Sequence, residues 1–342
     1  MWQWIVTLVL VVIATAYSVW ALMPRSWRAR LRGKRMPRTG CDVCSKNPSL
    51  PAMAIWIILF GIGGAGFAPN ANAEHVVTDD IGGSLTLSAP ARRIVSLAPG
   101  ATELLFSAGA GDLIVATVQG SDEPLAAKDI ERIGDANALK YKRLQALQPD
   151  VIVIWQDLAN RLVVESLQKL QLPLYFVSIR SFEDIPASIR RLGALAGTSP
   201  TADSVARQLT QRIDQLPKAP VTPRFDVFYM IWDSPLYTVG SRNLMSDAIT
   251  RCGGRNIFDD IDFPAPIVEF EVIKERNPDV IIMAAPPITL RDWRERWQAF
   301  PDIKAVQANR LVSFTDTRLT RMGPTALDSV GDLCKLMQSL PN

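Results

Sequence analysis

The chain has 342 residues, of which 48% are apolar and 21% charged, so it has room for one large globular domain or two lobes. This composition excludes a disordered chain, a coiled coil, a collagen-like repeat and a channel with many membrane spans. Residues 1–73 hold eight Lys or Arg and one acid, a net charge of +7, whereas residues 74–342 hold 29 basic and 33 acidic side chains, a net −4. The basic character belongs to the N-terminal segment, and nothing in the main body favours a nucleic-acid partner.

Two uncharged, apolar segments precede the main body. The first, Trp4–Met23, is long enough to span a bilayer as a helix, and seven basic side chains between Arg25 and Arg38 follow it. A basic loop of this kind is expected to stay in the cytoplasm. The second segment, Ser49–Ala73, ends in an A-x-A pattern that a signal peptidase could cut before Glu74.

We therefore expect residues 1–48 to form a transmembrane helix with a basic cytoplasmic loop, and residues 49–73 to form a second hydrophobic segment or signal peptide. A second possibility is that the natural start is Met36, with Arg38 and Lys46 at the basic end of an ordinary signal peptide. Both versions place the main body outside the cytoplasm, either anchored in the inner membrane by the N-terminal segment or released from it.

Two short motifs in this N-terminal part lack the context that their patterns require. Gly61, Gly63 and Gly66 match the G-x-G-x-x-G pattern of dinucleotide-binding proteins, but they lie inside the apolar export segment with no βαβ unit around them. Cys41 and Cys44 form a C-x-x-C pair in the expected cytoplasmic loop, where thiols stay reduced, and two ligands do not complete a zinc site. The role of this cysteine pair stays open.

From Arg92 onwards, short apolar runs alternate with amphipathic stretches, which is typical of parallel sheets covered by helices. Near-continuous apolar runs indicate strands that are buried on both faces. The predicted strands are Ile94–Leu97, Leu113–Val118, Val151–Trp155, Leu174–Val177, Phe225–Ile231, Val280–Ala284 and Leu311–Phe314. The predicted helices are Phe182–Leu216 with a break at Gly197–Pro200, then Leu244–Cys252, Glu269–Arg276 and Thr325–Leu340.

One pattern occurs twice in the main body, 129 residues apart. Leu144–Val153 and Ile273–Ile282 both read as a short helix that stops before a proline, followed at once by Asp and a buried strand. This distance is too long for a solenoid repeat. It predicts two similarly built α/β lobes, joined by the helical stretch between them, with one cleft between the lobes.

Few catalytic arrangements are available to this chain. Its single histidine, His75, lies beside the expected cleavage point, so neither a Ser-His-Asp triad nor a zinc site with several histidines can form. The chain has no G-x-x-x-x-G-K-[ST] loop for nucleotide phosphates. A carboxylate pair such as Asp122 and Asp135 is the remaining basis for a hydrolase. We expect a protein that is not an enzyme and holds no metal.

Two cysteines lie in the exported body. An even pair in an oxidising compartment favours a disulfide, here between Cys252 and Cys334. It would join the helix that ends at Cys252 to the C-terminal helix and close a loop of just over 80 residues. A loop of that length gives an upper limit of about 4.5 kcal/mol for its stabilisation.

Three segments resemble the ABC-transporter substrate-binding proteins with a rigid helical backbone, which carry cobalamin, haem and ferric siderophores. They are Arg93–Leu113 (RIVSLAPGATELLFSAGAGDL), Phe228–Gly240 (FYMIWDSPLYTVG) and Cys252–Phe258 (CGGRNIF). The last pattern, with Cys334 in the final helix, is similar to the periplasmic cobalamin-binding branch. The resemblance covers residues 91–340.

The resemblance implies a class III periplasmic binding protein. In this fold two Rossmann-like α/β lobes are joined by a long linking helix that allows little closure. We expect a first lobe over residues 91–197, the linking helix over 198–223 and a second lobe over 224–342. The implied protein is a periplasmic, monomeric receptor with no cofactor, which captures a corrinoid as transported ligand and delivers it to an ABC permease with its ATPase subunits.

The resemblance also implies which side chains touch the ligand. Trp155 matches a cleft tryptophan of the first lobe, and Trp232 and Tyr237 lie where the second lobe supplies its aromatic wall. The loop of Pro99, Gly100 and Ala101 is at the carboxyl end of a strand, where α/β crevices bind ligands. A broad, partly apolar corrinoid needs such aromatic faces and few polar anchors. Trp293 and Trp297, four residues apart, are expected to cover a contact between a helix and the sheet.

For docking on the permease, Glu271 matches the acid that the second lobe offers to a basic pocket. The first lobe has Arg161 at the matching place. Asp157 or Glu165, on the same predicted helix, could take over, since Glu165 lies one turn beyond Arg161.

The sequence departs from the resemblance at four further positions, where Glu123, Ala265, Thr317 and Thr320 replace aromatic or polar residues usual in the family. These departures bear on the ligand more than on the fold. Two alternatives therefore stay open. One is a receptor of the same fold for haem, with Tyr141, Tyr237 or another tyrosine as axial ligand, or for a ferric siderophore. The other is a membrane-tethered hydrolase that uses carboxylates in the cleft.

Overall fold

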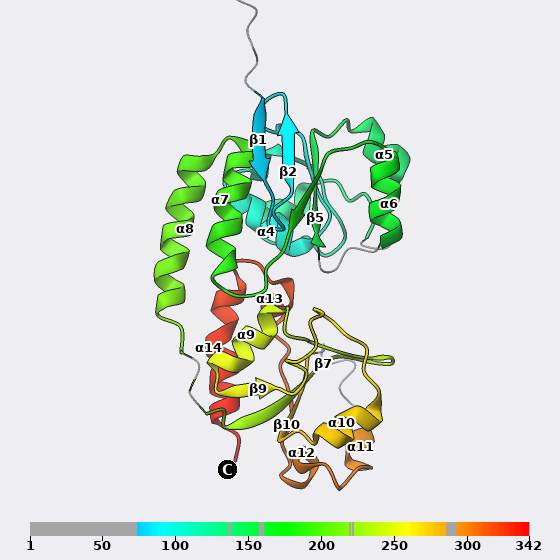
Figure 1. The fold of residues 1–342 in the computed structure, drawn as a ribbon, viewed down its shortest axis with the longest axis vertical. Coiled ribbons are helices and arrows are strands. Elements are labelled where there is room, and N and C mark those ends of the chain that lie inside the picture. The colour runs from blue at the N-terminus through cyan, green and yellow to red at the C-terminus, as the bar shows by residue number, and fades with distance from the viewer. Residues whose placement is uncertain are drawn as a thin grey trace, which may run out of the picture. The chain divides into compact units, whose positions relative to one another are not determined.

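The computed structural model describes residues 74–341 except 136–137, 157–160, 219, 221 and 285–292 (Figure 1). The expected transmembrane helix, basic loop, signal peptide and the Cys41–Cys44 pair lie outside the described residues. Within the described part, none of the helices has the length and apolar character that a membrane crossing requires.

The first described element is a hairpin that the sequence analysis missed. Strands β1 (His75–Thr78) and β2 (Ser84–Leu87) pair antiparallel. The completely buried carboxylate of Asp80 fastens this hairpin to the first lobe, since it accepts hydrogen bonds from Ser188 Oγ (2.7 Å) and Arg191 Nε (2.8 Å). His75 Nε2 lies 2.8 Å from the carbonyl of Ala194, so the single histidine has a structural contact.

The first lobe contains a four-stranded, fully parallel sheet. Its strands confirm the four predicted apolar runs. The two central strands are buried on both faces, and the two edge strands have partly buried side chains on one face. Side chains that alternate along the strands enter two different hydrophobic clusters, one on each face of the sheet. The order is β4 (Ile114–Ala116), β3 (Ile94–Ser96), β5 (Val151–Trp155) and β6 (Leu174–Val177).

Helices cover both faces of this sheet (Figure 1). One face packs against α4 and α7, and the other against the short helices α5 and α6. Two 3₁₀ turns, Gly111–Leu113 and Leu125–Asp129, complete the lobe. The helix bounds are Pro99–Ser107 for α4, Tyr141–Ala146 for α5, Arg161–Lys169 for α6 and Asp184–Ala196 for α7.

The second lobe repeats the strand order of the first. Counted along the chain within each lobe, both sheets have the parallel order second, first, third, fourth. An added strand, β8 (Leu236–Thr238), pairs antiparallel with the end of β7. The parallel strands are β9 (Gly254–Asn256), β7 (Phe225–Asp233), β10 (Val280–Met283) and β11 (Leu311–Ser313).

The second sheet is also covered on both sides. Helices α9, α13 and α14 pack in the cluster that continues from the first lobe, whereas α10, α11 and α12 pack on the opposite face. The helix bounds are Leu244–Arg251 for α9, Phe270–Arg276 for α10, Trp293–Gln298 for α11, Lys304–Gln307 for α12, Thr317–Arg321 for α13 and Ala326–Gln338 for α14.

The chain passes between the lobes through α8 (Ser199–Asp214), which packs along α7 (Figure 1). The predicted break falls between these two helices. Gly197 has a φ of 70°, a left-handed conformation that closes the end of α7, and Pro200 stands in the first turn of α8. Near its end, α8 is tied to α14 by an ion pair of 2.5 Å between Arg212 and Asp328.

The repeated sequence pattern forms the same local structure in both lobes. The residue before the proline, Gln148 or Asn277, has a φ of 46° in each case. The following aspartate then holds the start of the lobe's first strand through its carboxylate. Asp150 Oδ2 accepts from the backbone N–H of Arg93 at 2.8 Å, and Asp279 Oδ2 accepts from that of Asp226 at 2.9 Å. In each lobe this aspartate therefore joins the third parallel strand of that lobe to its first.

The disulfide expected between Cys252 and Cys334 is present and joins the end of α9 to α14. Both helices cover the same face of the second sheet. The bond therefore closes the C-terminal helix onto the lobe that it belongs to.

Replacing Cys252 and Cys334 together by serine should lower the free energy of unfolding by about 2–5 kcal/mol, because the cross-link restricts the unfolded chain. Urea unfolding of the full-length chain, followed by far-UV circular dichroism, measures this change. Dithiothreitol should weaken the wild type and leave the double serine variant unchanged. A Cys41→Ser, Cys44→Ser variant, denatured without reductant, should react with no thiol reagent; two free thiols would contradict the assignment.

Candidate ligand-binding site between the lobes

The predicted loop of Pro99, Gly100 and Ala101 forms the first turn of α4, directly after β3. Ala101 is fully buried, Gly100 is buried and Pro99 is partly exposed. The helix thus begins at the carboxyl edge of a parallel sheet, the edge at which α/β proteins bind their ligands.

A chain of buried hydroxyl groups holds this edge in place. Thr102 Oγ1 is 2.9 Å from both Ser96 Oγ and Thr117 Oγ1, and Thr117 Oγ1 donates to Ser121 Oγ at 2.9 Å. All four side chains are at most 1% exposed. Because buried hydroxyls are costly to leave without partners, this chain fixes the ends of β3 and β4 and the loop after β4 relative to α4.

Gly100 is the point at which the second lobe comes closest to α4. A Cβ atom on Gly100 would lie 2.0 Å from the carbonyl oxygen of Arg321 and 2.8 Å from Cζ3 of Trp155. No larger residue fits there without movement of the second-lobe backbone. Trp155, at the end of β5, is only 3% exposed and belongs to the hydrophobic cluster, so its indole lies against the helix at the lobe boundary.

Glu103, one turn beyond Gly100, was not singled out from the sequence. Its side chain is 3% exposed, and its carboxylate meets the second lobe. Thr325 Oγ1 donates to Oε2 at 2.6 Å, and Arg321 Nε forms an ion pair with Oε1 at 3.1 Å. Burial raises the pKa of Glu103, and the contacts with Thr325 and Arg321 offset this only in part.

A cavity of about 590 Å³, including space open to solvent, lies beside this contact. It has apolar walls and two carboxylates, and residues of both lobes form it. Glu123, which stands where the family has a tyrosine, faces this space. The lining residues are Glu103, Phe106, Ser107, Glu123, Pro124, Pro324 and Thr325.

The predicted aromatic residues of the second lobe lie at the turn between β7 and β8. Trp232 is 49% exposed, and its Nε1 donates to the carbonyl of Ser234 at 3.0 Å. Tyr237 is partly exposed, and its backbone forms an antiparallel β-bridge with Ile267, which is itself 55% exposed. Phe263 is exposed as well. Large exposed apolar side chains on two neighbouring segments, 232–237 and 263–267, are typical of a binding surface.

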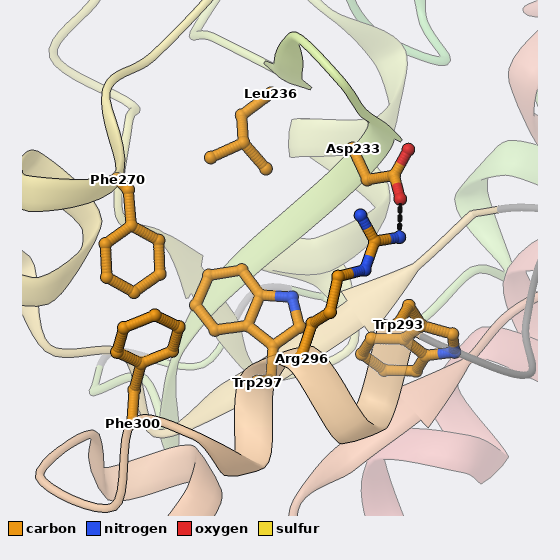
Figure 2. Close-up of a pocket in the computed structure, with 7 residues that line it drawn as sticks. All are labelled: Asp233, Leu236, Phe270, Trp293, Arg296, Trp297 and Phe300. Carbon is orange, nitrogen blue, oxygen red and sulfur yellow. Dashed lines mark hydrogen bonds and ion pairs between the residues drawn. The ribbon is translucent and has the colours of Figure 1, made fainter.

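A second cavity, of about 460 Å³, lies in the second lobe between α10, α11 and the β7–β8 turn (Figure 2). Figure 2 shows the rings of Phe270, Phe300 and Trp297 close together, and the Phe270 and Phe300 centroids are 4.1 Å apart. Trp297 also packs on Phe228 of β7 at 5.8 Å, and Trp293 is buried. Both tryptophans therefore cover the sheet, as expected.

Neither Glu271 nor Glu165 lines these cavities, although Glu271 directly follows Phe270, which lines the second one. Glu271 is exposed in the first turn of α10. Glu165 of α6 is partly exposed and forms an ion pair of 2.7 Å with Arg161, on the same face of the helix as expected. Asp157 lies outside the described residues.

The carboxylates considered for hydrolysis have structural partners. Asp122 pairs with Arg132 at 3.1 Å, and Asp135 Oδ1 accepts from the backbone N–H of Ala138 at 2.9 Å. Within the described ranges, no group of three or more His, Cys, Asp and Glu side chains is arranged to hold a metal ion.

The two lobes of one strand order, joined by a helix and with their strand ends at the boundary, define a class III periplasmic binding protein. Residues 94–317 match the periplasmic binding protein family, and the chain belongs to this family. The expected fold class is therefore confirmed.

Several relatives whose names state their ligand are similar to this chain over most of their length. A vitamin B12-binding protein of Vibrio campbellii is 29% identical over 252 residues, which cover 73% of this chain and 91% of that protein. The crystal structure of the periplasmic vitamin B12 binding protein BtuF of Vibrio cholerae is 28% identical, with a TM-score of 0.64 and coverage of 73% of this chain and 97% of that one. The periplasmic heme-binding protein RhuT from Roseiflexus sp. RS-1 is 20% identical with a TM-score of 0.59, a likeness of fold alone.

Proposed function

We propose that this protein is the periplasmic receptor of an ABC importer for cobalamin, which it binds between its lobes without altering it chemically. The observation that carries this proposal is the similarity to vitamin B12-binding proteins at 28–29% identity over about nine-tenths or more of their length. The haem-binding proteins RhuT and HutB, which have the same fold, are 20% and 19% identical to this chain. Delivery to a permease with ATPase subunits, and action as a monomer, belong to the same proposal.

The lobe boundary supports a large, partly apolar ligand. In this proposal Pro99, Gly100 and Ala101 with Trp155 form the first-lobe side, and Trp232 with Tyr237 forms the second. The exposed indole of Trp232 offers a flat apolar face, whereas Trp155 would act as the buried floor behind Gly100. Aromatic faces suit the edge of a corrin ring because they need few polar partners.

A haem or ferric-siderophore receptor is the second candidate, and the tyrosines restrict its haem version. Haem needs an axial ligand such as a tyrosine oxygen. Tyr175 and Tyr229 are fully buried, so neither phenol can reach a ligand in the cleft. Of the tyrosines that the structure describes, this leaves Tyr141 and Tyr237, which are partly exposed.

The ligand is tested by visible spectroscopy of the full-length chain after incubation with cyanocobalamin, haemin or a ferric hydroxamate and subsequent desalting. We expect the corrin absorption bands to stay with the protein in a 1:1 ratio. Retention of the haemin Soret band or of the ferric chelate, without cyanocobalamin, would replace the proposed ligand by the second candidate. Binding of none of the three would reject both.

Trp232→Ala should weaken cyanocobalamin binding by about 1–3 kcal/mol, because a flat apolar contact is lost at an exposed position where the fold does not need it. Trp155→Phe should also weaken binding while it retains most of the buried volume. Isothermal titration gives both dissociation constants. Val76→Ala, at an exposed apolar position of the β1–β2 hairpin, is the matched control. Unchanged constants in both tryptophan variants would return these residues to a structural role.

We further propose that Glu271 docks the receptor on its permease, with Glu165 or Asp157 as the acid of the first lobe. Glu271 is exposed and on a short helix at the surface, which suits a rim charge. Glu165 already forms an ion pair with Arg161, so docking through Glu165 would replace this pair by one with a basic side chain of the permease. Charges of this kind mainly set the association rate and its salt dependence.

Glu271→Lys should leave the affinity for cyanocobalamin within twofold of the wild type and weaken complex formation with the permease by about tenfold, through a slower association rate. Surface plasmon resonance with the permease in nanodiscs, at low and high salt, measures this. Asp214→Lys on α8 makes the same change of charge at another exposed position and serves as the control. Loss of ligand binding with normal docking would place Glu271 in the cleft instead.

A further inference from the structure

Besides the exposed Arg212–Asp328 pair between α8 and α14, the described residues include two polar contacts between the lobes that centre on a carboxylate withdrawn from solvent, and these two involve different helices. In the first, Glu103 of α4 reaches the segment Arg321–Thr325 between α13 and α14. Its carboxylate meets Thr325 Oγ1 at 2.6 Å and Arg321 Nε at 3.1 Å. This contact joins one side chain of the first lobe to two side chains of the second.

This first contact is closely fitted. Gly100 and Glu103 are three residues apart and therefore on the same face of α4. The Arg321 carbonyl fills the space at Gly100, and a Cβ atom on Gly323 would lie 2.6 Å from Glu103 Oε2. Glycine is needed at both positions because backbone and carboxylate occupy the space that a side chain would take. The segment Arg321–Thr325 therefore fits against this face of α4 in one position.

The second contact uses a carboxylate of the opposite lobe. Asp247 of α9 accepts a hydrogen bond of 3.0 Å from the backbone N–H of Phe182, which precedes α7 in the first lobe. Arg251, one turn on, contacts both Asp247 at 3.1 Å and Glu183 of the first lobe at 2.5 Å. Its guanidinium also lies 5.5 Å from the centroid of the Phe182 ring.

We propose that Glu103 and Asp247 are reciprocal anchors, one from each lobe, which fix the lobes against rotation and so hold the cleft at one width. One contact alone would act as a pivot, whereas two contacts on different helices remove that freedom. The buried cluster continues past them, since Trp155 of the first lobe and Leu319 and Met322 of the second belong to it. The role of the two anchors in positioning the ligand rests on the proposed function. Their role in holding the lobes together does not.

The charges around the anchors determine how they respond to pH. Glu103 faces Arg321 from α13 and Glu123 from the loop after β4, and Asp247 faces Arg251 of its own helix and Glu183 of the first lobe. Burial raises the pKa of both carboxyls. A carboxyl whose pKa is higher in the joined lobes than in water binds its proton more tightly there. Acid therefore strengthens the joined state, and the gain is lost as the pH rises through the raised pKa values.

Hydrogen exchange of the ligand-free, full-length chain tests the anchors. The readout is the protection factor, corrected for intrinsic exchange, of the amides in residues 317–326. Glu103→Ala should lower it at least tenfold while β10 keeps wild-type protection. Glu103→Gln keeps the shape and a carbonyl acceptor for Thr325, so it should stay within twofold. The wild type should be more protected at pH 5 than at pH 8, and Glu103→Gln should lose most of this difference.

Glu131→Gln is the matched control, since it makes the same change on an exposed acid that pairs with Arg143 inside the first lobe. Unchanged protection of 317–326 in Glu103→Ala would overturn the proposal, as would an equal loss in β10. If the alanine variant does not fold, an unaltered pH dependence in Glu103→Gln still overturns it. In a second arm, cyanocobalamin should bind about tenfold more weakly to Glu103→Ala. Absence of binding in the wild type would reject the proposed function and leave the exchange result standing.

Discussion

The close packing of α4 on the backbone of the second lobe is the contact on which the rest of the site depends. At Gly100 there is room for a hydrogen atom and nothing larger, because the Arg321 carbonyl and the Trp155 ring occupy the space. This contact decides where β5 ends relative to the second lobe, why Trp155 is buried, and where Glu103 finds its partners. The hydroxyl chain from Ser96 to Ser121 then holds the other side of the same helix. In the proposed function, a ligand between the lobes would therefore meet an edge that is already ordered.

The two lobes are variations on one structure. Their sheets share a strand order, and in each the aspartate after a proline fastens the third strand to the first. They differ where they meet the solvent. The second lobe adds β8 and exposes Trp232, Phe263 and Ile267, whereas the first keeps its boundary tryptophan inside. In the proposed function, this asymmetry would give the cleft one buried wall and one exposed aromatic wall.

The carboxylates that cross the lobe boundary are removed from water to different degrees, Glu103 almost completely and Asp247 in part, and this has a cost that packing must offset. A carboxylate taken out of water is destabilised unless donors and a cation surround it. Glu103 has both, and Asp247 has a backbone donor and Arg251. Contacts of this kind contribute less to total stability than to the choice of one arrangement. That is the property that a receptor with a fixed cleft requires.

The strands, the principal helices and the paired lobes follow from local pattern, because a strand buried on both faces must be apolar throughout and a helix before proline must end. The disulfide followed from the count of exported cysteines. The hairpin β1–β2 was missed because its strands are short and half exposed, and its anchor Asp80 finds its partners about 100 residues away. Glu103 was missed for the same reason, since its burial comes from residues more than 200 positions later. Sequence by itself determined the long apolar strands and the amphipathic helices, since these depend on neighbours along the chain, whereas the three-residue strands β8 and β9 and the short helices α11, α12 and α13 were not predicted. Tertiary structure alone decided that Trp155 is buried, that Trp232 is exposed and that a glutamate lies between the lobes, because burial of a side chain is set by whichever distant segment packs upon it.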